Sequence, residues 1–177
     1  MKKFKKVLLA SLLLSTTLMA NEPGQVTIDR TIGVNFVTFD GENGTGITFG
    51  FDRTYEIDSG FGLGWGVDID YSSLTVENID TIMYGANFKI VGRYDMSDKL
   101  NIPVTVKVNL GYEYTFFSDF LDTLSGVSYG VSTNYKFNNK LGVELAVKTG
   151  TFTGSTVYDT TNDYDKVTTN LNLLYKF

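Results

Sequence analysis

Residues 102–116 read IPVTVKVNLGYEYTF, and their pattern is the strongest indication of the fold class. Apolar or aromatic side chains occupy every even position from Ile102 to Phe116, whereas the odd positions carry polar residues, glycine and one proline. Strict alternation with a period of two is typical of a β-strand with one apolar face. The segment is much longer than the about five or six residues usual in soluble sheets. It also exceeds the ~9–11 residues that a tilted strand needs to cross a bilayer.

Seven further segments repeat this alternation, so the chain is predicted to contain eight strands. The tyrosines at 55, 94, 135 and 175 recur about every 40 residues, and the first three precede turn-forming residues. Each repeat therefore holds two strands and one tight turn, as in a series of β-hairpins. The seven segments are residues 32–39, 46–57, 62–72, 81–94, 126–137, 141–150 and 167–177.

The composition of the second face of these strands indicates which face meets water. A soluble lipocalin-like barrel turns its apolar face inward, whereas a membrane barrel turns it toward lipid. Glycine recurs opposite the apolar face, and small side chains suit the crowded interior of a narrow barrel. These glycines are Gly33, Gly50, Gly62, Gly64, Gly66, Gly85, Gly111, Gly126, Gly130, Gly142 and Gly150.

Charged residues on that second face are balanced, although the chain has a formal net charge of −5. A confined interior favours such balance, because breaking a buried ion pair costs about 3–5 kcal/mol. We therefore predict an interior plug of ion pairs and an apolar face toward lipid. The acidic members are Asp52, Glu56, Asp68, Asp70, Glu113 and Glu144, and the basic members are Lys89, Arg93, Lys107, Lys136, Lys148 and Lys176.

Nine of the other acidic residues lie in four connections, residues 40–46, 74–81, 117–125 and 151–165, which we predict to be long loops. The other three connections contain the turn formers of tight hairpins. Long loops at one end and short periplasmic turns at the other are typical of outer-membrane barrels. Two aromatic belts are predicted at the membrane interfaces. One contains Tyr55, Tyr94, Tyr135 and Tyr175, and the other contains Tyr71, Tyr84, Tyr114, Phe116 and Tyr129.

The first twenty residues have the features of a secretory signal peptide. Four lysines precede an apolar run from Val7 to Leu14, and the small residue Ala20 follows. The apolar run is shorter than the ~20 residues that a membrane-spanning helix needs. We expect cleavage after Ala20, which divides the chain into a signal peptide (1–20) and an outer-membrane β-barrel domain (21–177).

Charge and cysteine content exclude several classes of function. The chain holds 20 acidic residues, and its 15 basic residues become 11 when the four lysines of the signal peptide are removed. The phosphates of nucleic acids would repel such a chain, so we expect no nucleic-acid partner. A count of 0 Cys excludes disulfides and thiol chemistry.

The signal sequence, the eight amphipathic strands and the final residues LNLLYKF resemble small outer-membrane β-barrel proteins of Gram-negative bacteria. They are similar to the OmpA-like and OmpW-like barrels, which are grouped as porin-family or opacity-type proteins. The resemblance implies an all-β, eight-stranded antiparallel up-and-down transmembrane barrel in the outer membrane. It also implies outer-membrane lipid and lipopolysaccharide as partners, and a monomer. In that family the barrel assembly machinery reads the last strand, which here carries Leu171, Leu173, Tyr175 and Phe177.

Few residues are candidates for catalysis or metal binding. Outer-membrane barrel enzymes resemble one another in using a histidine base, and this chain has 0 His. Glu113 and Lys107 are the pair considered for acid–base chemistry, but an interior ion pair is the favoured interpretation. The oxygen atoms of Asp159, Asp163 and Asp165 suit Ca²⁺ or Mg²⁺, but their spacing matches no known loop. We predict no enzyme activity, no catalytic residue, no cofactor and no metal site.

Three functions remain open from the sequence. The favoured one is an integral outer-membrane barrel with a structural or surface-interaction role and a lumen filled by side chains. The second is a narrow porin-like channel for small solutes, and the third is a soluble periplasmic lipocalin-like carrier. Eight strands leave an interior just wide enough for side chains, which favours the first hypothesis over the second.

Overall fold

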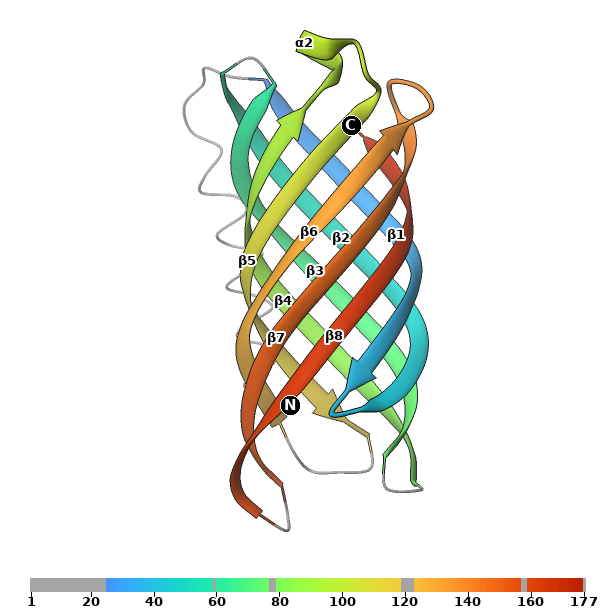
Figure 1. Ribbon diagram of the computed structural model, residues 1–177, viewed down its shortest axis with the longest axis vertical. Coiled ribbons are helices and arrows are strands. Elements are labelled where there is room, and N and C mark those ends of the chain that lie inside the picture. The colour runs from blue at the N-terminus through green and yellow to red at the C-terminus, as the bar shows by residue number, and fades with distance from the viewer. Residues whose placement is uncertain (1–24, 59, 77–78, 119–122, 157–158, 177) are drawn as a thin grey trace.

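Eight antiparallel strands form a closed up-and-down barrel in the computed structural model (Figure 1). The structure describes residues 25–58, 60–76, 79–118, 123–156 and 159–176, so the predicted signal peptide lies outside the described residues. Within the described ranges, no helix is long and apolar enough to cross a membrane. The elements are β1 (Val26–Phe39), β2 (Glu42–Asp58), β3 (Phe61–Val76), β4 (Ile79–Asp95), α2 (Ser97–Leu100), β5 (Val104–Phe117), β6 (Thr123–Lys136), β7 (Leu141–Thr156) and β8 (Asp159–Lys176).

The first and last strands close the sheet. Each strand pairs with the next along the chain, and β1 pairs with β8 from Asp29↔Lys176 to Phe39↔Lys166. Hydrocarbon offers no water to an open strand edge, and each unpaired backbone group there would cost several kcal/mol, on the order of 2–7. Closure is therefore what allows a sheet to stand in a bilayer, and the predicted fold class is confirmed.

The apolar face of the sheet points outward, as predicted. Leu110 and Leu145 are 56% and 55% exposed, whereas Lys107 and Glu144, on the same two strands, are 2% and 6% exposed. A soluble lipocalin-like carrier requires the opposite arrangement over the whole barrel, so that hypothesis is wrong. The outward surface of aliphatic and aromatic side chains is suited to acyl chains rather than to water.

The two ends of the barrel differ, and we name them by their connections. The turn end carries the β2–β3, β4–β5 and β6–β7 connections, and the loop end carries β1–β2, β3–β4, β5–β6 and β7–β8. In Figure 1 the turn end, with α2 and the end of β8, is uppermost. Both the start of β1 and the end of β8 lie at the turn end, since Asp29 pairs with Lys176.

Three of the four predicted long loops are wrong, because the strands continue through them. The β1–β2 connection is a turn at Asp40 and Gly41, whose positive φ angles of 47° and 86° are typical of tight hairpins. β3 runs to Val76 and β4 begins at Ile79, and β7 runs to Thr156 and β8 begins at Asp159. The β5–β6 connection lies mostly outside the described residues, and the longest connection, residues 96–103, lies at the turn end.

Cross-strand hydrogen bonds explain why these polar segments form strands. The Oγ1 atom of Thr75 donates to Asp80 at 2.8 Å. On the β7–β8 hairpin, Thr151 donates to Asp165 at 3.1 Å and Thr153 donates to Asp163 at 2.9 Å. Threonine favours extended backbone, and side chains paired across strands stabilise a sheet. Asp80, Asp163 and Asp165, which suggested loops, are outward members of paired strands.

The loop end also reverses the arrangement of apolar and polar side chains. Inside the barrel there, apolar side chains pack into a cluster that we name the apolar cap. Phe39 contributes to it, with its ring 5.2 Å from that of Phe117 and 5.6 Å from that of Tyr164. Outside, the strand neighbours of the cap are polar, including Thr38, Thr151 and Thr153. The buried members are Val37, Phe39, Leu74, Met83, Leu124 and Phe152, with Phe117 and Tyr164 packed against them.

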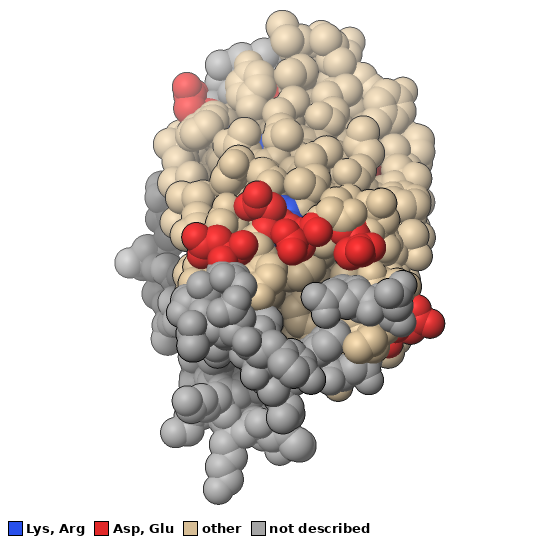
Figure 2. Space-filling view, turned by 60° about the horizontal axis from the view of Figure 1, so that its bottom comes forward, with Lys and Arg blue, Asp and Glu red and all other residues tan. Residues whose placement is uncertain are grey.

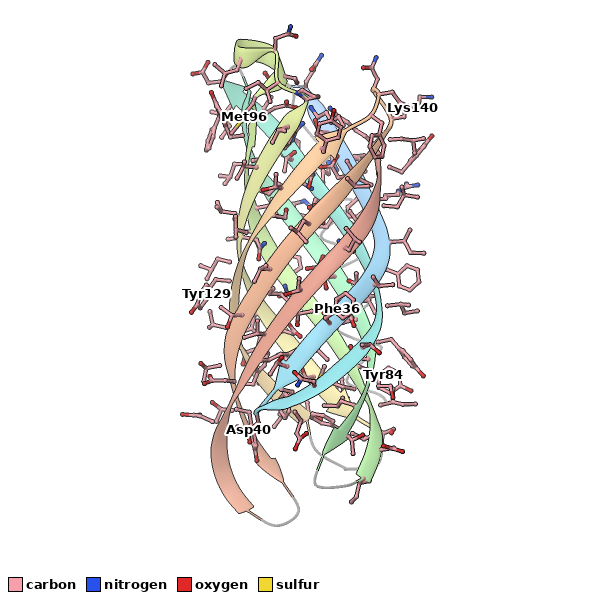
Figure 3. All side chains as sticks on the ribbon, turned by 45° about the vertical axis from the view of Figure 1, so that its right-hand side comes forward. Phe36, Asp40, Tyr84, Met96, Tyr129 and Lys140 are labelled. Carbon is pink, nitrogen blue, oxygen red and sulfur yellow. The ribbon has the colours of Figure 1, made fainter. Side chains whose placement is uncertain are left out.

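The predicted aromatic belts are present but uneven. Tyr71 and Tyr84 pair across β3 and β4 near the loop end, with ring centroids 5.4 Å apart. Tyr129, predicted for the same belt, lies farther from the loop end than Tyr84 (Figure 3). At the turn end, Tyr135 and Tyr175 point outward. Tyrosine suits these depths because its ring is apolar and its hydroxyl is polar.

Truncation of the cap should destabilise the barrel more than truncation of the lipid-facing surface. Phe152→Ala leaves a cavity in a packed interior, where such a change costs about 3–5 kcal/mol. Phe36→Ala is the matched control, because Phe36 is 54% exposed and acyl chains can fill the space. Denaturant unfolding in lipid vesicles measures both variants, and equal losses of unfolding free energy would contradict a packed cap.

Candidate functional site

The candidate functional site is the lumen, where ionisable side chains from all eight strands meet. The alternation of each strand sends every second residue inward, and the closed sheet brings these residues together (Figure 3). Among the described residues, ten ion-pair contacts connect them into three clusters, which we name central, loop-side and turn-side.

Lys107 is the centre of the central cluster. Its Nζ atom lies 2.7 Å from Asp29, 2.8 Å from Asp52 and 3.5 Å from Glu144, which come from three other strands. Lys89 extends the cluster, with Nζ at 3.0 Å from Asp52 and 2.8 Å from Asp68. Four carboxylates therefore share two ammonium groups, so this level of the lumen carries an excess of negative charge.

The loop-side cluster contains two lysines and two carboxylates. Lys148 Nζ lies 2.9 Å from both Asp70 Oδ2 and Glu113 Oε2, and Lys166 also pairs with Glu113. Lys166 Nζ stands 5.8 Å from the centroid of the Phe152 ring, within the range of a cation–π contact. This contact connects the charged lumen directly to the apolar cap.

The turn-side cluster contains two cations around one carboxylate. Arg93 Nη2 lies 2.6 Å from Asp95 Oδ2, and Lys136 pairs with the same carboxylate. Asp95 also accepts hydrogen bonds from the backbone N–H and the hydroxyl of Ser97, the first residue of α2. The cluster thus ties the β4–β5 connection to the barrel wall and adds positive charge beside the central cluster.

The near balance of interior charge agrees with the prediction, but its membership differs. Asp29, Asp95 and Lys166 are interior residues that the sequence reasoning missed. They were missed because the first and last strands were predicted too short and Asp95 was assigned to a turn. Continuing the same alternation outward along each strand is the signal that would have found Asp29 and Lys166. Glu56 and Lys176, predicted as interior partners, are half-buried at the turn end and form no ion pair among the described residues.

Glu113 and Lys107 are both interior, as predicted, but the structure does not pair them. Glu113 contacts Lys148 and Lys166, whereas Lys107 contacts Asp29, Asp52 and Glu144. The two side chains therefore belong to different clusters. Each charge is buried and surrounded by opposite charge, and this arrangement stabilises the ionised groups.

Acidic side chains gather on the outside of the loop end, with few basic ones among them (Figure 2). Asp40, Glu42 and Asp80 are exposed there, together with Asp163 and Asp165. Each of the last two accepts a threonine hydroxyl from β7. The side chain of Asp159 lies outside the described residues. Across the described part of the chain, no group of three or more acidic, histidine or cysteine side chains could hold a metal ion.

Several solved structures similar to this chain are outer-membrane proteins. OprG from Pseudomonas aeruginosa is 14% identical with a TM-score of 0.55, covering 89% of this chain and 98% of its own. Neisserial surface protein A is 12% identical with a TM-score of 0.59, covering 88% of this chain and 100% of its own. Ail, the attachment invasion locus protein of Yersinia pestis, is 13% identical with a TM-score of 0.55, covering 88% and 100% respectively. At these identities the similarity concerns the fold.

Comparison with curated protein sequences found no significant match. The family model described as the outer membrane protein beta-barrel domain, however, matches residues 7–177. The match includes all eight strands of the closed barrel. The chain therefore belongs to the outer-membrane β-barrel family of Gram-negative bacteria, and it resides in the outer membrane.

Proposed function

We propose that the protein is a non-conducting outer-membrane barrel with a structural or surface-interaction role. Its loop end faces the outside of the cell, and its turn end faces the periplasm. The observation that carries this proposal is the filled lumen, in which three ion-pair clusters lie in series with the apolar cap. In a barrel of this kind, partners can bind to the outer surfaces, but solutes cannot cross through the lumen.

The apolar cap opposes the alternative of a narrow channel. Met83 and Phe152 are 0% and 1% exposed, so these cap side chains are as buried as those in the core of a soluble protein. A hydrated solute would have to displace these side chains and then separate the ion pairs below them. Breaking one buried ion pair alone costs about 3–5 kcal/mol.

The lumen also supports a non-enzymatic role. A general acid or base must reach the proton that it transfers, within about 2.6–3.2 Å. Glu113 and Lys107 are 0% and 2% exposed, and both are engaged with countercharges. The chain has 0 His to supply a base near neutral pH. We therefore propose that it has no catalytic residue, cofactor or metal centre.

The outer surface supports lipid as the main partner. Outer-membrane acyl chains cover the apolar band, and lipopolysaccharide surrounds the loop-end hairpins, so a monomer buries its apolar surface without a second copy. On β8, Leu171, Leu173 and Tyr175 point outward, and we propose that the barrel assembly machinery reads this strand. Phe177, the last residue of that predicted signal, lies outside the described residues.

The loop-end hairpins are the part of the barrel that a partner outside the cell can reach. β7 and β8 continue past the apolar band as a hairpin of paired strands (Figure 1). Because cross-strand hydrogen bonds order this hairpin, it presents a defined surface. We assign any surface-interaction role to this end.

Planar-bilayer recording tests the non-conducting lumen. We expect the folded protein, verified by heat-modifiable migration on gels, to show no discrete conductance steps, because the cap and ion pairs leave no hydrated route. The heat-unfolded sample serves as the blank. Reproducible steps of one size from the folded sample alone would establish the channel hypothesis instead.

The central cluster should be essential for stability. Lys107→Met leaves Asp29, Asp52 and Glu144 without their shared cation, and we expect a loss of about 3–5 kcal/mol of unfolding free energy. Adding Asp29→Asn should recover part of this loss, because it removes one of the carboxylates left unpaired. Lys140→Met, at an exposed turn residue, is the control and should change stability by about 0.5 kcal/mol or less. Equal stability of the Lys107 and Lys140 variants would refute the network.

The proposed signal peptide predicts the N-terminus of the mature protein. Protein isolated from outer membranes should begin at Asn21, as determined by N-terminal sequencing and intact mass. Ala20→Leu should slow cleavage, because signal peptidase requires a small residue there. Mature protein that retains residues 1–20, or that is recovered from the soluble periplasmic extract, would contradict this processing.

A further inference from the structure

Two arginines interrupt the lipid-facing surface near the turn end. Arg30 on β1 is exposed and Arg53 on β2 is half-exposed, and both occupy outward positions of their strands. The pairings Arg30↔Phe51 and Ile28↔Arg53 make them diagonal neighbours. Between the turn-end tyrosines and the polar hairpins, the described outward residues are otherwise uncharged. The positive charge is therefore concentrated at one place on the lipid-facing surface.

A charged residue facing lipid is costly, by roughly 2–4 kcal/mol for arginine at the midplane, and the cost falls near the interface. The register places this pair near the interface. Arg30 pairs with Tyr175, and Arg53 precedes Tyr55 by two residues on the same face. The guanidinium carbon of Arg53 lies 5.0 Å from the centroid of the Tyr55 ring, in cation–π contact. The arginines thus lie at the depth of lipid headgroups.

Two buried hydrogen-bond donors at this place have no acceptor among the described residues. Arg53 pairs in register with Trp65 on β3, and neither Arg53 Nε nor Trp65 Nε1 donates to any atom of the described structure. The carboxylates of neighbouring Asp29 and Asp52 face inward, where they bind Lys107. These two carboxylates are therefore not available to the outward guanidinium groups.

We propose that Arg53, with Arg30 beside it, forms a binding site for the phosphate of an anionic phospholipid. The planar guanidinium offers paired donors that match phosphate oxygens, and the neighbouring Trp65 and Tyr55 are suited to the headgroup region. The lipid comes from the leaflet that meets the turn end. This is the inner leaflet under the proposed orientation, but the phosphate chemistry does not depend on that orientation.

Native mass spectrometry of detergent-extracted full-length protein tests the site, with phosphatidylglycerol and phosphatidylcholine added separately. We expect the wild type to retain phosphatidylglycerol preferentially. Arg53→Gln should weaken that binding by about tenfold, as expected for loss of charge-assisted hydrogen bonds. Arg53→Lys should give an intermediate value, because it keeps the charge but loses the planar donor pair. Arg30→Gln should also weaken binding, whereas Lys140→Gln, an exposed cation at a turn, should not.

Heat-modifiable migration verifies that each variant is folded. If Arg53→Gln does not fold, the Arg53→Lys and Arg30→Gln variants test whether the two arginines bind the lipid phosphate. Equal retention of phosphatidylglycerol by wild type and folded arginine variants would overturn the proposal. Equal binding of both lipids by the wild type would do the same. A dimer of the wild type that the arginine variants lose would assign the pair to a second copy of the chain instead.

Discussion

The pairing of β1 with β8 is the constraint on which the rest of the structure depends. A bilayer offers no hydrogen-bond partner to a strand edge, so the sheet must close, and closure at eight strands leaves a narrow interior. That interior accepts side chains only if they are small or mutually compensating. An added β-carbon at Gly46 would lie 1.8 Å from the backbone oxygen of Tyr71, and one at Gly64 would lie 1.9 Å from that of Arg53. Both oxygens belong to the adjacent strand. A charged side chain in the lumen is stabilised by neighbours of opposite charge, as the three carboxylates around Lys107 show.

The barrel is surrounded by lipid over part of its length and by water at the loop end. The apolar side chains accordingly point outward in the first part and inward in the second. In the band that meets lipid, Leu110 and Leu145 point outward while Lys107 and Glu144 point inward. At the loop end, threonine and aspartate point outward while Phe152 and Met83 pack inside. The change marks where the strands leave the hydrocarbon, because beyond that level water covers the outside and the hydrophobic effect acts toward the lumen. The apolar cap is thus a small soluble-type core built on a membrane barrel.

The apolar cap and the three ion-pair clusters fill the lumen. For this reason we propose that the outer surfaces of the barrel, and not its lumen, carry the function. The lumen is occupied by groups that stabilise one another, so the parts available to partners are the loop-end hairpins and the lipid-facing wall. OprG, NspA and Ail share this architecture at 12–14% identity, which shows how little of the sequence the fold itself requires. Alternation and closure are the shared requirements, and individual contacts are free to vary.

The sequence alone determined the strand number, the outward direction of the apolar face and most of the interior charged residues. These features follow from a period of two, which any stretch such as residues 102–116 displays without reference to its neighbours. Only the tertiary structure decided which charges pair. Glu113 and Lys107 are six residues apart on β5, yet register across the barrel gives them different partners. The apolar cap and the extended hairpins were also invisible to local reasoning. Threonine and aspartate near a turn suggest a loop until a facing strand supplies their hydrogen bonds, and Phe152 has a core to enter only once the barrel has closed.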